Sequence, residues 1–251
     1  MSAKEVTACL IIIGNEILSG RTKDANLPYL AVGLNELGVR LREARVIPDI
    51  EETIVATVNE ARARFDYVIT TGGIGPTHDD ITADAVAKAF GVNIGINKEA
   101  YDRLLKHYGD PAIFTPARQR MARIPDTATL IDNPVSVAPG FQIGNVFVLA
   151  GVPMIVQAMF QSFKHRLVGG MPVLSRTVRV SLPEGTIAEP LAALQKQYAD
   201  LEIGSYPSFR QGKISTGLVL RGTDGARLDK GAGELVAILS GLGGDPELVE
   251  G

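Results

Sequence analysis

The sequence has little that would support a secreted or membrane-spanning protein. Its 251 residues include one cysteine, Cys9, so no disulfide can form within the chain, which fits a reducing compartment. No run approaches the roughly 20 apolar residues of a membrane span. The start, MSAKEVTACLIIIG, has neither a long enough signal-peptide core nor a cleavage site. We therefore expect a cytoplasmic protein.

Basic clusters are missing as well. The net charge is -3, and no block of lysine and arginine occurs. Because nucleic acids and anionic membranes both favour clustered cations, neither is expected as the main partner, and a small molecule is. With 45% hydrophobic residues, the chain can bury the core of one large domain, or of one medium and one small domain.

Alternating strand and helix patterns predict the fold of the first part of the chain. Residues 7–13 form a continuous apolar run typical of a strand buried on both faces, and residues 24–37 carry leucines at helical spacing. The alternation continues with strands at 39–47, 66–71 and 146–150, and with helices at 51–64, 82–90, 98–108 and 154–168. Such alternation predicts a three-layer α/β/α sandwich with a mostly parallel sheet.

The pattern changes near residue 172, where we place a domain boundary. Residues 1–171 form the first domain, and residues 172–251 follow the order strand, helix, strand, strand, helix of a small α+β domain of split βαβ type. The last residues, GGDPELVEG, are expected to fray. The long segment DPAIFTPARQRMARIPDTATLIDNPVSVAPGFQIG is expected to hold little regular structure and to close over a pocket.

The stretch TTGGIGPTHDDIT, residues 70–82, lies between a predicted strand and a predicted helix. In an open parallel sheet, ligands bind beyond the carboxyl ends of the strands. Gly72, Gly73 and Gly75 lack side chains, so their backbone N–H groups can approach an anion closely. The spacing matches neither the dinucleotide-binding nor the P-loop motif, so a tight turn without a ligand remains an alternative.

Two adjacent acids follow the glycines. Asp79 and Asp80 would repel a phosphate unless a metal bridges them, so together they favour divalent-metal phosphate chemistry. The alternative is that one of them caps the helix. His78 is either a third metal ligand or a solvent-exposed loop residue.

A second candidate stretch, GNEILSGRTKDAN, follows the first predicted strand. Glu16 stands at a strand end as the glycine loop does, so the two could face one another across neighbouring strand tips. Asp24 and Asn26 begin the next helix, where capping is the expected role.

Three stretches, GNEILSGRTKDAN, TTGGIGPTHDDIT and NPVSVAPGF with VFVLAGVP, together resemble the MoaB/Mog molybdopterin-binding domain. The likeness is closer to the amino-terminal domain of CinA proteins and to the molybdopterin-binding-like domain of FAD synthases. It covers residues 6–168. The later stretch LEIGSYPSF is similar to the small domain that follows in FAD-synthase-type proteins.

The resemblance implies a site for a pterin or nucleotide phosphate, and possible residue roles. The implied catalytic residues are Asp79, Asp80 and Glu16, of which Asp80 and Glu16 would hold the metal. The implied substrate-binding positions are Asn15, Thr71, Gly72, Gly73, Gly75, Pro139, Gly140 and Gly151.

The families that this sequence resembles differ in activity, so the resemblance implies more than one possible reaction. Mog-type enzymes adenylylate molybdopterin, whereas CinA-type and FAD-synthase-type domains resemble pyrophosphatases that split ADP-ribose or FAD with a divalent metal such as Mg²⁺, often aided by potassium. The stretches THDD and ARQRMARIP favour the second branch. The alternative is a protein that binds molybdopterin or a nucleotide without turning it over.

Several residues leave alternatives open. Ser136 and Val137 stand where glycine and threonine are usual in the similar families, which bears on catalysis more than on the fold. Arg118 or Arg120 could neutralise charge on phosphate oxygens, or could be solvated surface residues. The apolar stretch VPMIVQAMFQSF could form the interface of a homo-oligomer, or could belong to the core.

Overall fold

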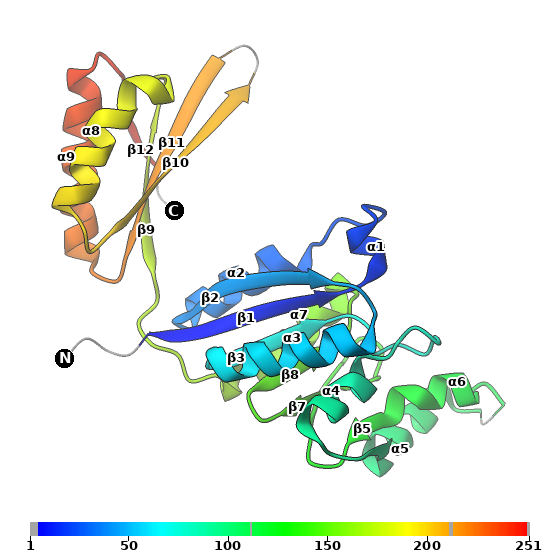
Figure 1. Cartoon of the computed structure of the whole chain (residues 1–251). Coiled ribbons are helices and arrows are strands. Elements are labelled where there is room, and N and C mark those ends of the chain that lie inside the picture. The colour runs from blue at the N-terminus through cyan, green and yellow to red at the C-terminus, as the bar shows by residue number, and fades with distance from the viewer. Residues whose placement is uncertain (1–4, 111, 211–212, 250–251) are drawn as a thin grey trace. The chain divides into compact units, whose positions relative to one another are not determined.

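The chain folds into two compact units. The structure, a computed structural model, describes residues 5–110, 112–210 and 213–249. The units are Met1–Gly170 and Met171–Gly251, and each has its own hydrophobic core. In the first unit, helices cover both faces of one sheet, so the predicted three-layer α/β/α sandwich is confirmed (Figure 1).

The central sheet of the first unit has six strands in the order β2-β1-β3-β8-β7-β6. The first four run parallel, and β7 and β6 extend the sheet in antiparallel fashion. The parallel strands are β1 (Val6–Ile13), β2 (Val39–Ile47), β3 (Tyr67–Thr71) and β8 (Val146–Leu149). Their carboxyl ends therefore meet at one edge of the sheet.

Strand β1 is buried on both faces, which places one helix layer on each side. Cys9, Ile11 and Ile13 pack in the core with α3 (Glu51–Arg64), α4 (Thr82–Phe90) and α5 (Lys98–Tyr108). The alternate residues Ala8, Leu10 and Ile12 pack with α2 (Asn26–Glu36) and α7 (Pro153–Phe163). This follows from the two-residue side-chain period of a strand. Figure 1 places α2 and α3 on opposite sides of the sheet.

The segment between α5 and β8 is more regular than the sequence predicts. It contains α6 (Pro116–Gln119), a 3₁₀ turn at Arg120–Ala122, β5 (Arg123–Pro125), β6 (Thr129–Ile131) and β7 (Gly140–Ile143). β5 pairs with β4 (Ile94–Ile96), and β6 and β7 join the main sheet. The expectation of little regular structure was wrong because strands of three or four residues are too short to show a period.

The second unit is a four-stranded antiparallel sheet with the order β10-β11-β9-β12. Its elements are β9 (Leu174–Val180), α8 (Glu184–Gln197), β10 (Glu202–Arg210), β11 (Lys213–Gly222), α9 (Gly225–Gly241) and β12 (Glu247–Val249). Both helices cover one face in Figure 1, as the split βαβ pattern predicts. The chain end was expected to fray, but β12 pairs with β9.

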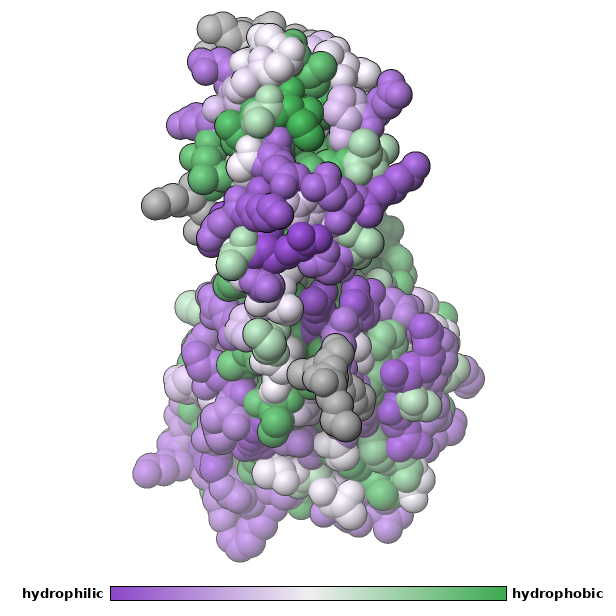
Figure 2. Space-filling view, turned by 90° about the vertical axis from the view of Figure 1, so that its left-hand side faces the viewer, coloured by the Kyte–Doolittle hydropathy of each residue, from purple (hydrophilic) through white to green (hydrophobic). Residues whose placement is uncertain are grey.

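Hydrophilic residues are spread over both units on the face that Figure 2 shows, with smaller apolar areas among them. Within the ranges that the structure describes, no helix has both the length and the apolar character needed to cross a bilayer.

Helices α2 and α7, which cover the same face of the sheet, pack closely at Gly33. A Cβ atom at Gly33 would lie 2.5 Å from the Phe160 ring. That ring is held edge-on between Tyr29 and Phe163. We expect Gly33→Ala to lower the free energy of unfolding by about 1–3 kcal/mol, because overpacking outweighs the helix propensity of alanine. Urea unfolding of the full chain would measure it.

Gly233 in α9 is the matched control, because a Cβ atom there meets no atom within 4 Å. Gly233→Ala is expected to stabilise its unit by up to about 1 kcal/mol. Equal stabilisation by both substitutions would contradict the close packing of α2 on α7.

Candidate functional site

A cavity of about 510 Å³ lies where the parallel strands end. Its lining comes from the turns after β1, β2, β3 and β8, and from the loop before β7. The turn after β1 contributes Glu16, and the loop after β3 contributes the glycines and both aspartates. The predicted facing of the two stretches across neighbouring strand tips is therefore confirmed.

The glycine loop after β3 is held by backbone hydrogen bonds. Gly72 and Gly73 have φ values of 103° and 69°, in the region that favours glycine. The N–H of Gly72 donates to Leu149 O at 3.1 Å, and Gly73 O accepts from Thr82 N at 3.0 Å. A Cβ atom at Gly73 would lie 2.1 Å from Thr82 Oγ1, so only glycine fits there.

The backbone hydrogen bonds of the glycine loop rule out one implied ligand contact and leave the later amides of the loop available. The N–H of Gly72 already donates to Leu149 O in β8, so it cannot also donate to a ligand. For the N–H groups of Gly73, Ile74 and Gly75, the described residues supply no hydrogen-bond acceptor, and all three residues line the cavity. The donors available for an anion therefore begin at Gly73.

Thr77 binds both acids of the loop. Its hydroxyl oxygen lies 2.6 Å from Asp79 Oδ1 and 2.6 Å from Asp80 Oδ2, and its N–H donates to Asp80 Oδ2 at 2.8 Å. The pKa of Asp79 is lowered, and the hydrogen bond from the Thr77 hydroxyl is the main cause because it stabilises the charged carboxylate. Ile81, at the N-cap of α4, makes no side-chain cap, and Asp80 is bonded to Thr77 instead.

Two carboxylates in the cavity lie directly against glycines. Both carboxylate oxygens of Glu16 would be 2.6 Å from a Cβ atom at Gly14, and Asp80 Oδ2 would be 2.7 Å from one at Gly75. Glu16 belongs to the short helix α1 (Asn15–Leu18). A side chain at either glycine would therefore displace a carboxylate that lines the cavity.

Asp49 is a cavity residue that the sequence analysis missed. It follows β2, lines the cavity, and accepts a hydrogen bond from the Asn15 N–H at 2.9 Å. The available signal was its position directly after a strand, which is the position that identified Glu16.

The charged side chains in the described lining of the cavity are all acidic. Glu16, Asp49, Asp79 and Asp80 line it, and the described lining includes no lysine, arginine or histidine. A bare anion would be repelled there unless a cation accompanied it. Among the residues that the structure describes, no three His, Cys, Asp or Glu side chains gather as a ready metal site. The acidic wall could thus hold a cation only with ligands from elsewhere.

Several implied binding positions do not line this cavity. The Asn15 N–H is bonded to Asp49. Thr71 is buried, with a hydroxyl that has no partner in the described chain. Gly140 is also buried, because a Cβ atom there would lie 2.4 Å from Val148 O. Gly151 does line the cavity, and its carbonyl accepts from Asn26 Nδ2 at 2.8 Å.

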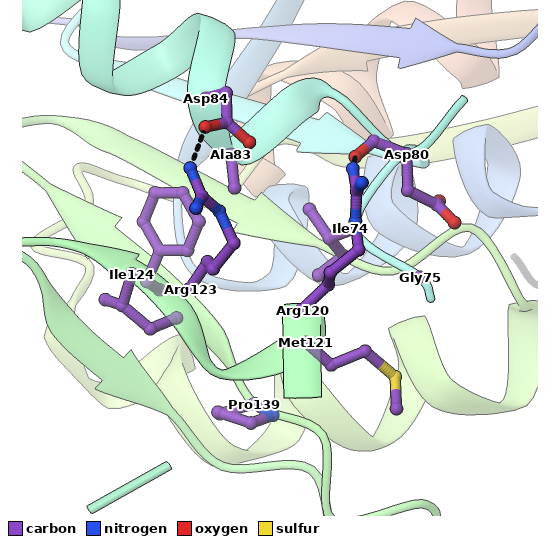
Figure 3. A pocket seen from close by; sticks show the side chains of 11 residues that line it. Ile74, Gly75, Asp80, Ala83, Asp84, Arg120, Met121, Arg123, Ile124 and Pro139 are labelled. Carbon is purple, nitrogen blue, oxygen red and sulfur yellow. Dashed lines mark hydrogen bonds and ion pairs between the residues drawn. The ribbon is translucent and has the colours of Figure 1, made fainter. Parts of the chain in front are cut away.

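Pro139 lines a smaller hollow that shares Asp80 and Gly75 with the main cavity (Figure 3). Arg120 lies in this hollow and donates to Asp80 O at 3.4 Å, as the dashed line in Figure 3 marks. Arg123 lies there too, and it is paired with Asp84.

Other candidates lie away from the cavity. Arg118 donates to Ile113 O at 2.6 Å and lies over the Tyr108 ring, so it is not placed to neutralise a phosphate. The His78 side chain is 97% exposed and does not line the cavity, which favours the exposed-loop interpretation.

The two predicted caps of α2 differ. Asp24 Oδ1 accepts from Leu27 N at 2.8 Å, as capping predicts. Asn26 is 5% exposed and binds Gly151 instead, so its predicted capping role was wrong. It ties the start of α2 to the turn after β8.

Comparison with known proteins gives matches along both units. A family described as "Probable molybdopterin binding domain" matches residues 9–170, and "FAD synthase, middle domain" matches residues 172–242. A protein from Pyrobaculum calidifontis is 37% identical over 211 residues, 80% of each chain, and one from Pyrobaculum arsenaticum is 40% identical over 212 residues, 80% of this chain and 79% of that one.

Among solved structures, the protein CinA of unknown function from Thermoplasma acidophilum is similar to this chain. The identity is 34% and the TM-score is 0.61, over 65% of this chain and 99% of that chain. The similarity thus extends over nearly all of a protein that is shorter than this chain.

Replacing the Thr77 hydroxyl tests the arrangement of the acids. We expect Thr77→Val to raise the pKa of Asp79 toward its ordinary value, because the charged form loses its main hydrogen-bond donor. Wild-type Asp79 should therefore stay ionised to lower pH than the variant. Carboxyl ¹³C NMR titration would measure the difference. Thr77→Ser keeps the hydroxyl and is the control; an unchanged pKa in Thr77→Val would contradict the assigned cause.

Proposed function

The chain belongs to the probable molybdopterin-binding domain family over residues 9–170, and from this premise we propose that it is a metal-dependent pyrophosphatase acting on ADP-ribose or FAD-like nucleotide diphosphates. The observation that carries the proposal is the cavity itself, where four carboxylates stand beside backbone amides without a partner. The match of residues 172–242 to a FAD synthase domain supports the FAD-like substrate class. We place the activity in the cytoplasm.

The donor set fits a divalent cation that shares its coordination shell with the substrate. Mg²⁺ is commonly held by one or two carboxylates, several waters and substrate phosphates, so a closed protein site is not required. Asp80 and Glu16 would hold it, since both carboxylates line the cavity. A bound divalent cation would neutralise phosphate charge and polarise an attacking water.

The chain's own groups would supply binding and orientation. The N–H groups of Gly73, Ile74 and Gly75 would donate to phosphate oxygens, and the amino-terminal end of α4 adds a positive dipole end nearby. Asp79, whose pKa is lowered, stays a carboxylate near neutral pH. It would orient a water by accepting a hydrogen bond from it, because a lowered pKa makes a carboxylate a weaker proton acceptor.

A second function, binding of molybdopterin or a nucleotide without turnover, is kept because the family description itself names molybdopterin. The residues that differ from the similar families, Ser136 and Val137, also belong to a loop of the cavity wall. Adenylyl transfer to molybdopterin would use the same cavity and backbone amides, and it is the third candidate function.

The experiment combines calorimetry with chromatographic detection of AMP on the full chain, because hydrolysis of the pyrophosphate bond gives AMP and ribose 5-phosphate from ADP-ribose, and AMP and FMN from FAD, without free phosphate. ADP-ribose and FAD are offered with Mg²⁺, with and without potassium, and after chelation with EDTA. We expect Asp80→Asn to slow hydrolysis at least about 10–100-fold, the loss typical even for partners of metal ligands. Asp102→Asn is the control, because this carboxylate of α5 binds Lys98 and does not line the cavity.

The outcomes separate the candidates. Hydrolysis by Asp80→Asn at the wild-type rate would show the metal assignment to be wrong. Tight binding without AMP formation favours the second function, and nucleotide transfer to a pterin favours the third.

A further inference from the structure

The loop of residues 133–138 forms one wall of the cavity and contains a strained residue. Val137 has φ 65°, and in the described part of the chain it is the one non-glycine residue with positive φ. A β-branched side chain is strongly disfavoured in this region, at a cost of order 1–3 kcal/mol. Other interactions must therefore hold the loop in this conformation.

Asn133 supplies those interactions from inside the loop. It is 5% exposed, and its Oδ1 accepts from the N–H groups of Val135 at 3.1 Å and Ser136 at 3.2 Å. Its Nδ2 donates to Ser136 Oγ at 2.6 Å and to Ala138 O at 2.8 Å. Its backbone O accepts from Val137 N at 3.0 Å. The carboxamide thus makes four hydrogen bonds within the loop, which is its full capacity.

This network orients the hydroxyl of Ser136, which lines the cavity. A serine hydroxyl has one proton to donate and two lone pairs. One lone pair of Ser136 is used by Asn133 Nδ2, and the described residues provide no acceptor for the hydroxyl proton. The proton therefore remains available to a group outside the loop.

We propose that Ser136 is a phosphate-binding residue whose hydroxyl donates to a phosphate oxygen of the bound ligand, with Asn133 as the residue that positions it. The proposal rests on the proposed function only in requiring a phosphorylated ligand, hydrolysed or not. A cavity with four carboxylates offers a phosphate few donors, so one fixed hydroxyl in the same cavity as the amides of Gly73 to Gly75 has a large effect on affinity.

The test uses isothermal titration of the full chain with a methylene-bridged analogue of ADP-ribose, which cannot be hydrolysed between its phosphorus atoms, and with inorganic pyrophosphate, each with Mg²⁺. We expect Ser136→Ala to weaken both by roughly tenfold or more, since the lost hydrogen bond is to a charged group. Ser136→Thr keeps the hydroxyl and should recover most of the affinity. Ser208→Ala is the matched control, because its hydroxyl bonds Ser215 O within the second unit.

Hydrogen exchange in the ligand-free chain separates binding from loop structure. Ser136→Ala should leave the exchange of the Ser136 and Val137 amides unchanged, because Asn133 still accepts from the backbone, whereas Asn133→Ala should speed it. Faster exchange in Ser136→Ala would assign the hydroxyl to loop structure and overturn the proposal.

The binding outcomes also distinguish this inference from the proposed function. If the wild-type chain binds both ligands and Ser136→Ala binds them equally well, the inference alone fails. If the wild-type chain binds neither ligand with Mg²⁺, the proposed function fails and takes the inference with it.

Discussion

Repulsion among carboxylates is the constraint on which the cavity depends. Four acids line one space whose described lining includes no basic side chain, and the exposed His78 ring outside the lining lies 4.0 Å from Asp79 Oδ1. Thr77 holds Asp79 and Asp80 by hydrogen bonds, and Asp49 accepts the amide of Asn15. Such an arrangement leaves the negative charge uncompensated, and a cavity with uncompensated charge favours a cation.

The glycines do more than expose backbone amides in the cavity. Gly72 joins β3 to β8 through its N–H, while Gly14 and Gly75 leave room for the carboxylates of Glu16 and Asp80. The absence of side chains thus serves strand pairing and acid placement as well as access to backbone amides. A glycine-rich loop at a strand end can therefore serve strand pairing and the placement of carboxylates that could hold a metal, even without a phosphate ligand.

The sequence predicted the features that have a local signal. The layers follow from apolar periodicity, and Glu16 and Asp80 were placed by their positions after strands. Thr71 and Gly140 were implied by motifs, but a motif does not say which neighbour faces inward, and both are buried. β12 has three residues and exists because of its pairing with β9, a long-range contact without local signature.

The apolar part of the cavity bears on which ligand it accommodates. Ile13, Ile74, Met121 and Ile155 line it, and no aromatic side chain is found among the lining residues that the structure describes. A flat pterin, flavin or adenine ring would pack on aliphatic side chains, which contact any such ring without a hydrogen-bonding pattern to select among them. Under the proposed function, discrimination between ligands would come from the polar half of the cavity, where the number and placement of phosphates would decide how many carboxylates a shared cation can satisfy.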